Sequence, residues 1–164
     1  MDRLWSPWRL EYVTGSKPQT GCVFCNAPRP PDSDSLIVYE RNTCYVILNL
    51  YPYNNGHVMV VPYRHTPSLA SLTSEERHEM ADLQALCEKV LAEAYQPHGI
   101  NIGVNLGKPA GAGVVEHVHV HLVPRWNGDT NFMTVVGTTR VLPEDLPQSA
   151  ARLKPIFAKL GNAS

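Results

Sequence analysis

The stretch that decides the fold is "EHVHVHLVPRW", residues 116–126, in which His117, His119 and His121 alternate with apolar residues. Period-two alternation with β-branched partners is typical of a β-strand. Successive side chains of a strand point to opposite faces, so we expect the three imidazoles to share one face. The chain has seven histidines, and solvation does not explain why three gather here, since Thr, Lys or Glu would serve as well. The row therefore predicts either metal ligands or catalytic groups.

Working outward from this strand, the sequence predicts a single α+β domain over residues 1–164, with an N-terminal arm and a C-terminal tail. No internal repeat or linker divides it. Short connections among the first three expected strands favour antiparallel pairing. The four strands expected besides the histidine strand are residues 36–40, 43–50, 57–62 and 99–106.

Two helices complete the predicted domain. The first begins at Thr73, which with Glu76 forms a capping-box pattern, and ends before Pro97. Apolar residues recur along it at helical spacing, so one face should be buried. The second helix is short, at residues 148–160, and we expect it to be bent or broken near Pro155.

Charge and cysteine usage narrow the class of protein. The net charge is −1, so no basic surface argues for duplex nucleic acid, although imidazoles and loop amides could hold a small phosphate-bearing molecule. The N-terminus lacks the apolar run of a signal peptide and no segment is long enough to span a membrane, so we expect a cytoplasmic protein without a membrane partner.

In a cytoplasmic protein we expect the four cysteines to be thiols or metal ligands rather than disulfides. Cys44 and Cys87, in apolar segments, should belong to the core.

The sequence "CVFC" contains a C-x-x-C pair, Cys22 and Cys25. This spacing is typical of zinc sites and of redox pairs. The pair does not lie between a strand and a helix, which argues against a thioredoxin-like role. A zinc ion would need two more ligands, and no second C-x-x-C is present. Histidines would have to supply them, from His65 or from the histidine strand.

A glycine-rich loop, "NLGKPAGAG" at residues 105–113, leads directly into the histidine strand. Glycines let backbone N–H groups approach an anion closely, so such a loop can bind phosphate, although it can also be an ordinary flexible connection. It is not a Walker loop, because no Lys-Ser/Thr follows its last glycine. Upstream, "NNGHVMVVP" places His57 at the start of a strand, and Asn49 ends the strand before it. Neither residue alone distinguishes a structural from a functional role.

The H-x-H-x-H motif followed by two apolar residues, the glycine-rich loop before it and the upstream "GHVMVVP" together resemble the histidine triad superfamily of nucleotidyl hydrolases and transferases. The match covers about residues 22–125. The segments "LWSPWRLEYV" and "PRWNGDTNFM" further resemble the diadenosine tetraphosphate phosphorylase branch. The resemblance implies a five-stranded antiparallel sheet that extends across a homodimer.

The resemblance also implies roles for individual residues. His119 would attack the α-phosphorus of a nucleotide and form a nucleotidyl-imidazole intermediate. A backbone carbonyl would orient it through its other ring nitrogen. His121 and His57 would contact the α-phosphate, and Asn49 matches a position that often binds ribose.

Zinc-bearing members of the superfamily bind a structural zinc ion with a C-x-x-C, a histidine after the "GHVMVVP" strand and the first histidine of the triad. Carried over to this chain, the ligands are Cys22, Cys25, His65 and His117. The two histidines would supply the two further zinc ligands that the C-x-x-C pair alone does not provide.

One departure from the family pattern bears on the reaction. Triad hydrolases typically have a Gly-Gln pair whose glutamine lies four residues before the first motif histidine, whereas this chain has Ala112-Gly113 in its place. The missing side-chain amide would leave room for inorganic phosphate as the acceptor. Backbone amides of the loop and the side chains of Asn105 and Lys108 would hold this phosphate. The leading hypothesis is therefore a phosphorylase that cleaves diadenosine tetraphosphate into ADP and ATP. The alternatives are a hydrolase of dinucleoside polyphosphates or nucleoside phosphoramidates, and a non-catalytic nucleotide-binding regulator.

Overall fold

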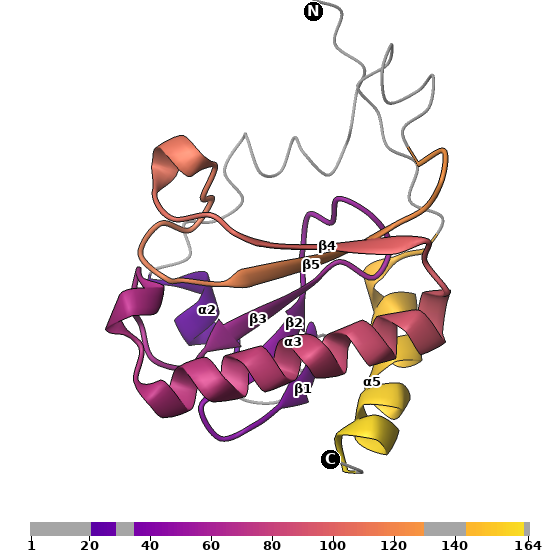
Figure 1. The fold of residues 1–164 in the computed structure, drawn as a ribbon, viewed down its shortest axis with the longest axis horizontal. Helices are drawn as coiled ribbons and strands as arrows, with labels where there is room; N and C mark the ends of the chain where they lie inside the picture. The colour runs from indigo at the N-terminus through magenta and orange to yellow at the C-terminus, as the bar shows by residue number, and fades with distance from the viewer. Residues whose placement is uncertain (1–20, 29–34, 130–143, 163–164) are drawn as a thin grey trace, which may run out of the picture.

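The computed structural model describes residues 21–28, 35–129 and 144–162, so the predicted N-terminal arm and most of the C-terminal tail lie outside it. Its strands form one antiparallel sheet in the order β1-β2-β3-β5-β4, as Figure 1 shows. This confirms the expected α+β fold. The strands are β1 (Ile37–Glu40), β2 (Cys44–Leu48), β3 (Val58–Pro62), β4 (Gly99–Val104) and β5 (Val120–Arg125).

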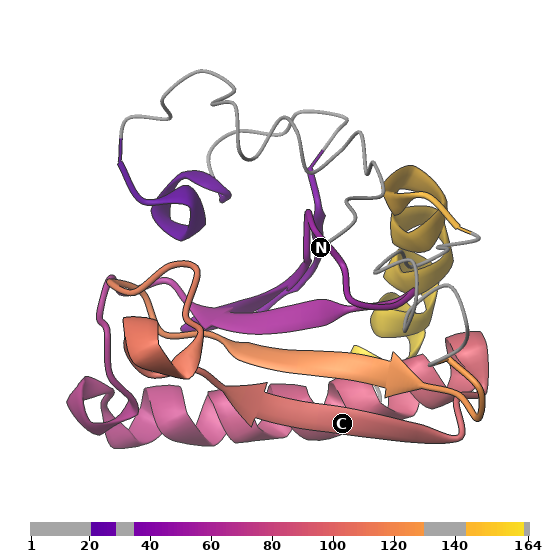
Figure 2. The same cartoon turned by 90° about the horizontal axis from the view of Figure 1, so that it is seen from above.

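The helices cover the two faces of this sheet unequally. The long α3 lies along one face, with α5 packed beside it, while α2 lies on the opposite side (Figure 2). None of the described helices is both long and apolar enough to cross a membrane. The helical segments are α2 (Val23–Asn26), η1 (Leu69–Ser71), α3 (Ser74–Tyr95), η2 (Lys108–Ala110) and α5 (Leu146–Gly161).

The predicted capping box begins α3. The Glu76 backbone N–H donates to the Thr73 hydroxyl at 3.2 Å, and the Glu76 carboxylate accepts from the Thr73 N–H at 2.7 Å. Two N–H groups that the helix would leave unpaired are thus satisfied. The helix ends at Tyr95, because Gln96 takes a left-handed conformation and Pro97 follows.

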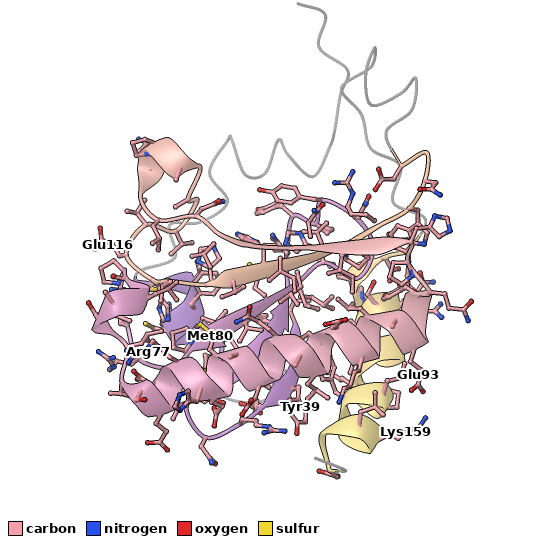
Figure 3. The ribbon with its side chains drawn as sticks, in the orientation of Figure 1. Tyr39, Arg77, Met80, Glu93, Glu116 and Lys159 are labelled. Atoms are coloured by element: carbon pink, nitrogen blue, oxygen red, sulfur yellow. The ribbon has the colours of Figure 1, made fainter. Side chains whose placement is uncertain are left out.

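Two apolar clusters, one on each face of the sheet, form the core. On the α3 side, Val58 and Val60 of β3 pack with Met80, a sheet-facing residue of the helix labelled in Figure 3. The alternate residues of the same strand, Met59 and Val61, belong to the cluster on the α2 side. Cys44 and Cys87 are fully buried in the α3-side cluster, as predicted.

The predicted break at Pro155 is wrong, because α5 continues through it. Leu153 and Phe157 flank the proline and are both fully buried against the core. Their burial on the two sides of Pro155 offsets the backbone hydrogen bond that proline removes. At its far end, α5 is tied to α3 by an ion pair between Lys159 and Glu93 at 2.9 Å (Figure 3).

Candidate active site and metal cluster

The histidine row is only partly a strand, which corrects the sequence-based expectation. β5 begins at Val120, the first residue that pairs with both β3 and β4, so His117 and His119 precede the strand. The preceding segment is held instead by the Val118 N–H, which donates to the carbonyl of Thr66 at 2.7 Å. The extended backbone still keeps the alternation, since Val118 and Val120 are buried in the α3-side cluster.

His119 is buried and is held through one ring nitrogen. Its Nδ1 donates a hydrogen bond to the backbone carbonyl of His117 at 2.8 Å, and the side chain is 4% exposed. Burial lowers its pKa, so the ring is neutral near pH 7. In that neutral form Nδ1 carries the proton and Nε2 carries a lone pair. Such an imidazole is able to act as a nucleophile.

His57 and His121 form a hydrogen-bonded pair whose protons can be assigned. The Tyr53 backbone N–H donates to Nδ1 of His57 at 3.1 Å, so the proton of neutral His57 is on Nε2. That Nε2 lies 3.0 Å from Nδ1 of His121 and donates to it. His121 consequently carries its own proton on Nε2 and presents a donor. The ring centroids of His121 and His119 are 4.8 Å apart, so this donor lies beside the candidate nucleophile.

Burial, more than neighbouring charge, keeps this pair neutral. Burial, with the neighbouring His121 and His119 adding to it, lowers the pKa of His57 to about 3. Burial, with His119 adding to it, lowers the pKa of His121 to about 4. A neutral pair can donate to the oxygens of a phosphate without having to lose a proton first.

A polar network behind His57 fixes the loop that carries it. The side-chain amide of Asn54 donates to the carbonyl of Pro124 and to Asp129, both at 2.9 Å, and the backbone carbonyl of Asn54 accepts from the His57 N–H. Asp129 is in turn paired with Arg125 at 2.6 Å. Sequence reasoning missed this network, because Asn54 and Asp129 are 75 residues apart and carry no motif of their own.

Asn49 lies beside the same pair. Its side-chain nitrogen is 3.4 Å from both ring nitrogens of His57, and its side-chain oxygen accepts from the Tyr51 N–H at 3.0 Å. The structure therefore places beside His57 the residue to which the family resemblance gives a role in ribose binding.

The glycine-rich loop is held differently. The Asn105 amide donates to the carbonyl of Gly111 at 3.4 Å, which closes the loop on itself. Ala112 is buried, and a Cβ added at Gly113 would meet nothing within 4 Å. Within the described ranges, no hydrogen bond or ion pair joins Asn105 or Lys108 to a histidine, so the structure does not bring these two into contact with the triad.

The four residues proposed as metal ligands, Cys22, Cys25, His65 and His117, come together in one group of side chains, the metal cluster. One donor atom from each lies within 4.8 Å of the others. Cys22 Sγ is 3.3 Å from His117 Nδ1, and Cys25 Sγ is 3.3 Å from His65 Nδ1. These separations approach the edge of about 3.6 Å that a tetrahedral zinc shell gives between sulfur and nitrogen ligands. The arrangement therefore fits a metal ion.

The other ring nitrogen of His117 supports this assignment. Its Nε2 donates to the carbonyl of Pro62 at 2.8 Å, so the proton is on Nε2 and the lone pair is on Nδ1, directed at the cysteines. Metal-bound histidines commonly have their second nitrogen fixed in this way.

Phe24, between the two cysteines, was not singled out in the sequence. Its ring centroid is 4.7 Å from that of His119 and 5.5 Å from that of His117. The two ends of a C-x-x-C turn are recognisable by type, whereas an apolar residue inside it gives no signal of what it packs against.

Fold and site together define the class of protein: the chain belongs to the HIT domain family, whose model matches residues 31–128. It is 38% identical over 167 residues to an AP-4-A phosphorylase of Mycobacterium tuberculosis, covering 97% of this chain and 86% of that protein. A bis(5'-adenosyl)-triphosphatase of Dictyostelium discoideum is 29% identical over 134 residues, covering 78% of this chain and 89% of that protein. A Zn-bound histidine triad family protein from Mycobacterium smegmatis has a similar structure, with a TM-score of 0.69 and 32% identity over 87% of this chain and 97% of that one.

Proposed function

We propose that this protein is a nucleotide-processing enzyme that transfers a nucleotidyl group from diadenosine tetraphosphate to inorganic phosphate, giving ADP and ATP. The observation that carries the proposal is the environment of His119, whose Nδ1 is bound to a carbonyl while Nε2 keeps its lone pair. The similarity to an AP-4-A phosphorylase over 97% of the chain supports the choice of substrate.

In the first step, Nε2 of His119 attacks the α-phosphorus. The bond from phosphorus to the bridging oxygen breaks, ATP leaves, and AMP remains attached to His119 as a nucleotidyl-imidazole. The Nε2–H of His121, set by the hydrogen bond from His57, donates to an α-phosphate oxygen as charge builds there. Asn49, beside His57, binds the ribose.

In the second step, an oxygen of inorganic phosphate attacks the same phosphorus. The phosphorus–nitrogen bond breaks, ADP forms and His119 regains its free lone pair. The loop before the triad supplies the phosphate site through its backbone amides and the side chains of Asn105 and Lys108, next to Ala112. Gly113 stands where hydrolases have glutamine, and the space beside it leaves room for the anion.

We further propose that Cys22, Cys25, His65 and His117 hold a structural zinc ion. Such an ion supplies no chemistry to the transfer; it closes four ligands around itself and ties α2 to the segment before β5. The zinc-bearing relative from Mycobacterium smegmatis supports this choice of metal. No disulfide joins the cysteines, all four of which lie in the described part of the chain, and this fits a reducing compartment such as the cytoplasm.

We also propose a homodimer in which the sheet continues through β4. This strand lies at the edge of the sheet, and its Ile102 is 48% exposed. An exposed edge strand with apolar side chains favours pairing with another strand. Sedimentation equilibrium at micromolar concentration should give twice the mass of the chain.

The direct test is incubation with diadenosine tetraphosphate in the presence and absence of inorganic phosphate. The proposal predicts ADP and ATP, with turnover that falls sharply when phosphate is withheld. Equal rates in both buffers, with AMP as the product, would identify a hydrolase. Binding of the nucleotide without turnover in either buffer would identify a regulator.

A further inference from the structure

The helical turn between the two cysteines is too short to be stable by itself. It comprises four residues, Val23–Asn26, and its first residue lacks a side-chain cap. Among the described residues, the Phe24 side chain packs into the apolar cluster on the α2 side of the sheet, and polar contacts also attach the turn. The Tyr45 hydroxyl donates to the carbonyl of Phe24 at 2.7 Å, and the flanking cysteines meet the two histidines of the metal cluster.

Phe24 connects this turn to His119, the proposed nucleophile, through a contact between their rings. Its side chain is 6% exposed and belongs to the cluster on the α2 side of the sheet, away from α3 (Figure 2). The Phe24 ring lies 4.7 Å from the His119 ring at an interplanar angle of 47°. Such contacts between flat rings restrict how the imidazole can tilt about its hydrogen bond to the His117 carbonyl.

His117 provides the second connection. Its Nδ1 faces Cys22, its Nε2 is fixed by Pro62, and its backbone carbonyl receives the hydrogen bond from His119. The only hydrogen bond found for the His119 side chain in the described part of the chain therefore ends on a residue of the metal cluster. Of the groups around the His119 ring, the Phe24 ring belongs to the turn itself, and the His117 carbonyl belongs to a residue that the cysteines of the turn contact.

We propose that Phe24 is a positioning residue for His119, and that the Cys22–Cys25 turn, held by the metal cluster, sets the orientation of the nucleophile. The inference rests on the proposed role of His119 and adds a function to a cluster otherwise described as structural. Misplacement of a reacting group by about 1 Å can lower a rate a hundredfold. Removing the Phe24 ring from one side of the imidazole should therefore change the reaction rate measurably.

The kinetic test compares variants of neighbouring residues in the same turn. Phe24→Ala should lower the single-turnover rate of ATP release from diadenosine tetraphosphate at least about tenfold, and Phe24→Leu by less, with KM within about twofold of wild type. Val23→Ala is the matched control, because Val23 is 42% exposed, and it should behave as wild type. A rise in KM with an unchanged single-turnover rate would overturn the proposal and assign Phe24 to substrate binding.

The second test needs no substrate, so it stands even if the proposed reaction is wrong. The Nδ1–H of His119 is buried and hydrogen-bonded, and should give a slowly exchanging imidazole signal in ¹H–¹⁵N spectra, assigned with His119→Ala. Phe24→Ala and Cys22→Ser should each shift this signal and speed its exchange, whereas Val23→Ala should not. Chelation of the metal should likewise shift the signal of the wild-type protein and speed its exchange, and added zinc chloride should restore the original signal. An unchanged signal in both variants and after chelation would overturn the proposal.

Discussion

At the scale of single residues, the site depends on where each imidazole keeps its proton. One backbone N–H, that of Tyr53, fixes the proton of His57, and through it the proton of His121. One carbonyl, that of His117, fixes the proton of His119 on the opposite nitrogen. Neighbouring histidines thus present a donor and a lone pair, a combination that three chemically identical side chains reach only through different hydrogen-bond partners.

Replacing the nucleophile should abolish the reaction without disturbing the fold. We expect His119→Ala to lower turnover of diadenosine tetraphosphate by at least about a thousandfold, because no other group can form the covalent intermediate. Nucleotide binding and the thermal midpoint should change little. The control is His78→Ala, an exposed histidine of α3, which should retain wild-type turnover. Turnover of His119→Ala within tenfold of wild type would exclude the assignment.

At the scale of elements, the segments that carry the site are held by contacts at their ends. The N-terminus of α3 is an example, since the Glu76 carboxylate receives the Thr73 N–H and pairs with Arg64 at 2.6 Å. The hydrogen bonds from Arg64, aided by that of Thr73, lower the pKa of Glu76 to about 2. Because Arg64 precedes His65, this pair also fixes the strand end that leads to the metal cluster.

The shifted pKa of Glu76 makes one contribution to stability pH-dependent. A carboxyl whose pKa is lower in the folded chain stabilises it above its unfolded pKa, near 4.5, and the contribution is lost as pH falls from there to about 2. We expect Glu76→Gln to lower the thermal midpoint by about 2 °C at pH 7, a small effect because the Arg64 side chain is 44% exposed, although that of Glu76 is only 10% exposed. The difference from wild type should shrink below pH 4.5. Glu75→Gln, exposed in the same turn, is the control; a Glu76→Gln effect constant from pH 7 to pH 3 would contradict this account.

Removing the metal cluster should loosen α2. Wild-type protein should contain about one zinc ion per chain by elemental analysis, as one tetrahedral site requires. The double variant Cys22→Ser with Cys25→Ser should contain none, and its thermal midpoint should fall, because metal binding is coupled to folding. Purified wild type that is free of metal while its cysteines are reduced would refute the zinc proposal.

Element types were largely predictable from the sequence because they depend on local patterns. The capping box marked the start of α3 and Pro97 its end, and short apolar runs marked the strands. Two errors came from tertiary contacts that local patterns do not encode. β5 starts late because its pairing with β3 ends at Val60 and its pairing with β4 ends at Val104, and α5 passes Pro155 because the core holds both sides of it.

At the scale of the whole molecule, the sheet brings together residues that are remote in the chain. Placing β5 between β3 and β4 puts His57 beside His121, 64 residues later, and brings Cys22 to His117 across 95 residues. Residue types and motif spacing identified the histidines and cysteines in advance. The partners that orient them, Tyr53, Asn54 and Phe24, became visible only once the sheet order was known.

Under the proposed function, Gly113 in the loop before the triad should decide which acceptor is used. We expect Gly113→Gln to shift the product from ADP towards AMP, because the new amide occupies the phosphate position and orients water. The backbone of Gly113 is not left-handed and the space beside it is open, so the side chain fits. Gly113→Ala adds bulk without an amide and should still give ADP. An unchanged ratio of ADP to AMP in Gly113→Gln would contradict this role.

The central claim, transfer of a nucleotidyl group to phosphate, is tested most directly by following the phosphate itself. Labelled inorganic phosphate should be incubated with diadenosine tetraphosphate and the wild-type protein, and the nucleotides separated and degraded stepwise. Attack of phosphate on the nucleotidyl-His119 intermediate predicts the label in the β-position of ADP and none in ATP. Unlabelled products, with AMP in place of ADP, would contradict the account and show that water is the acceptor.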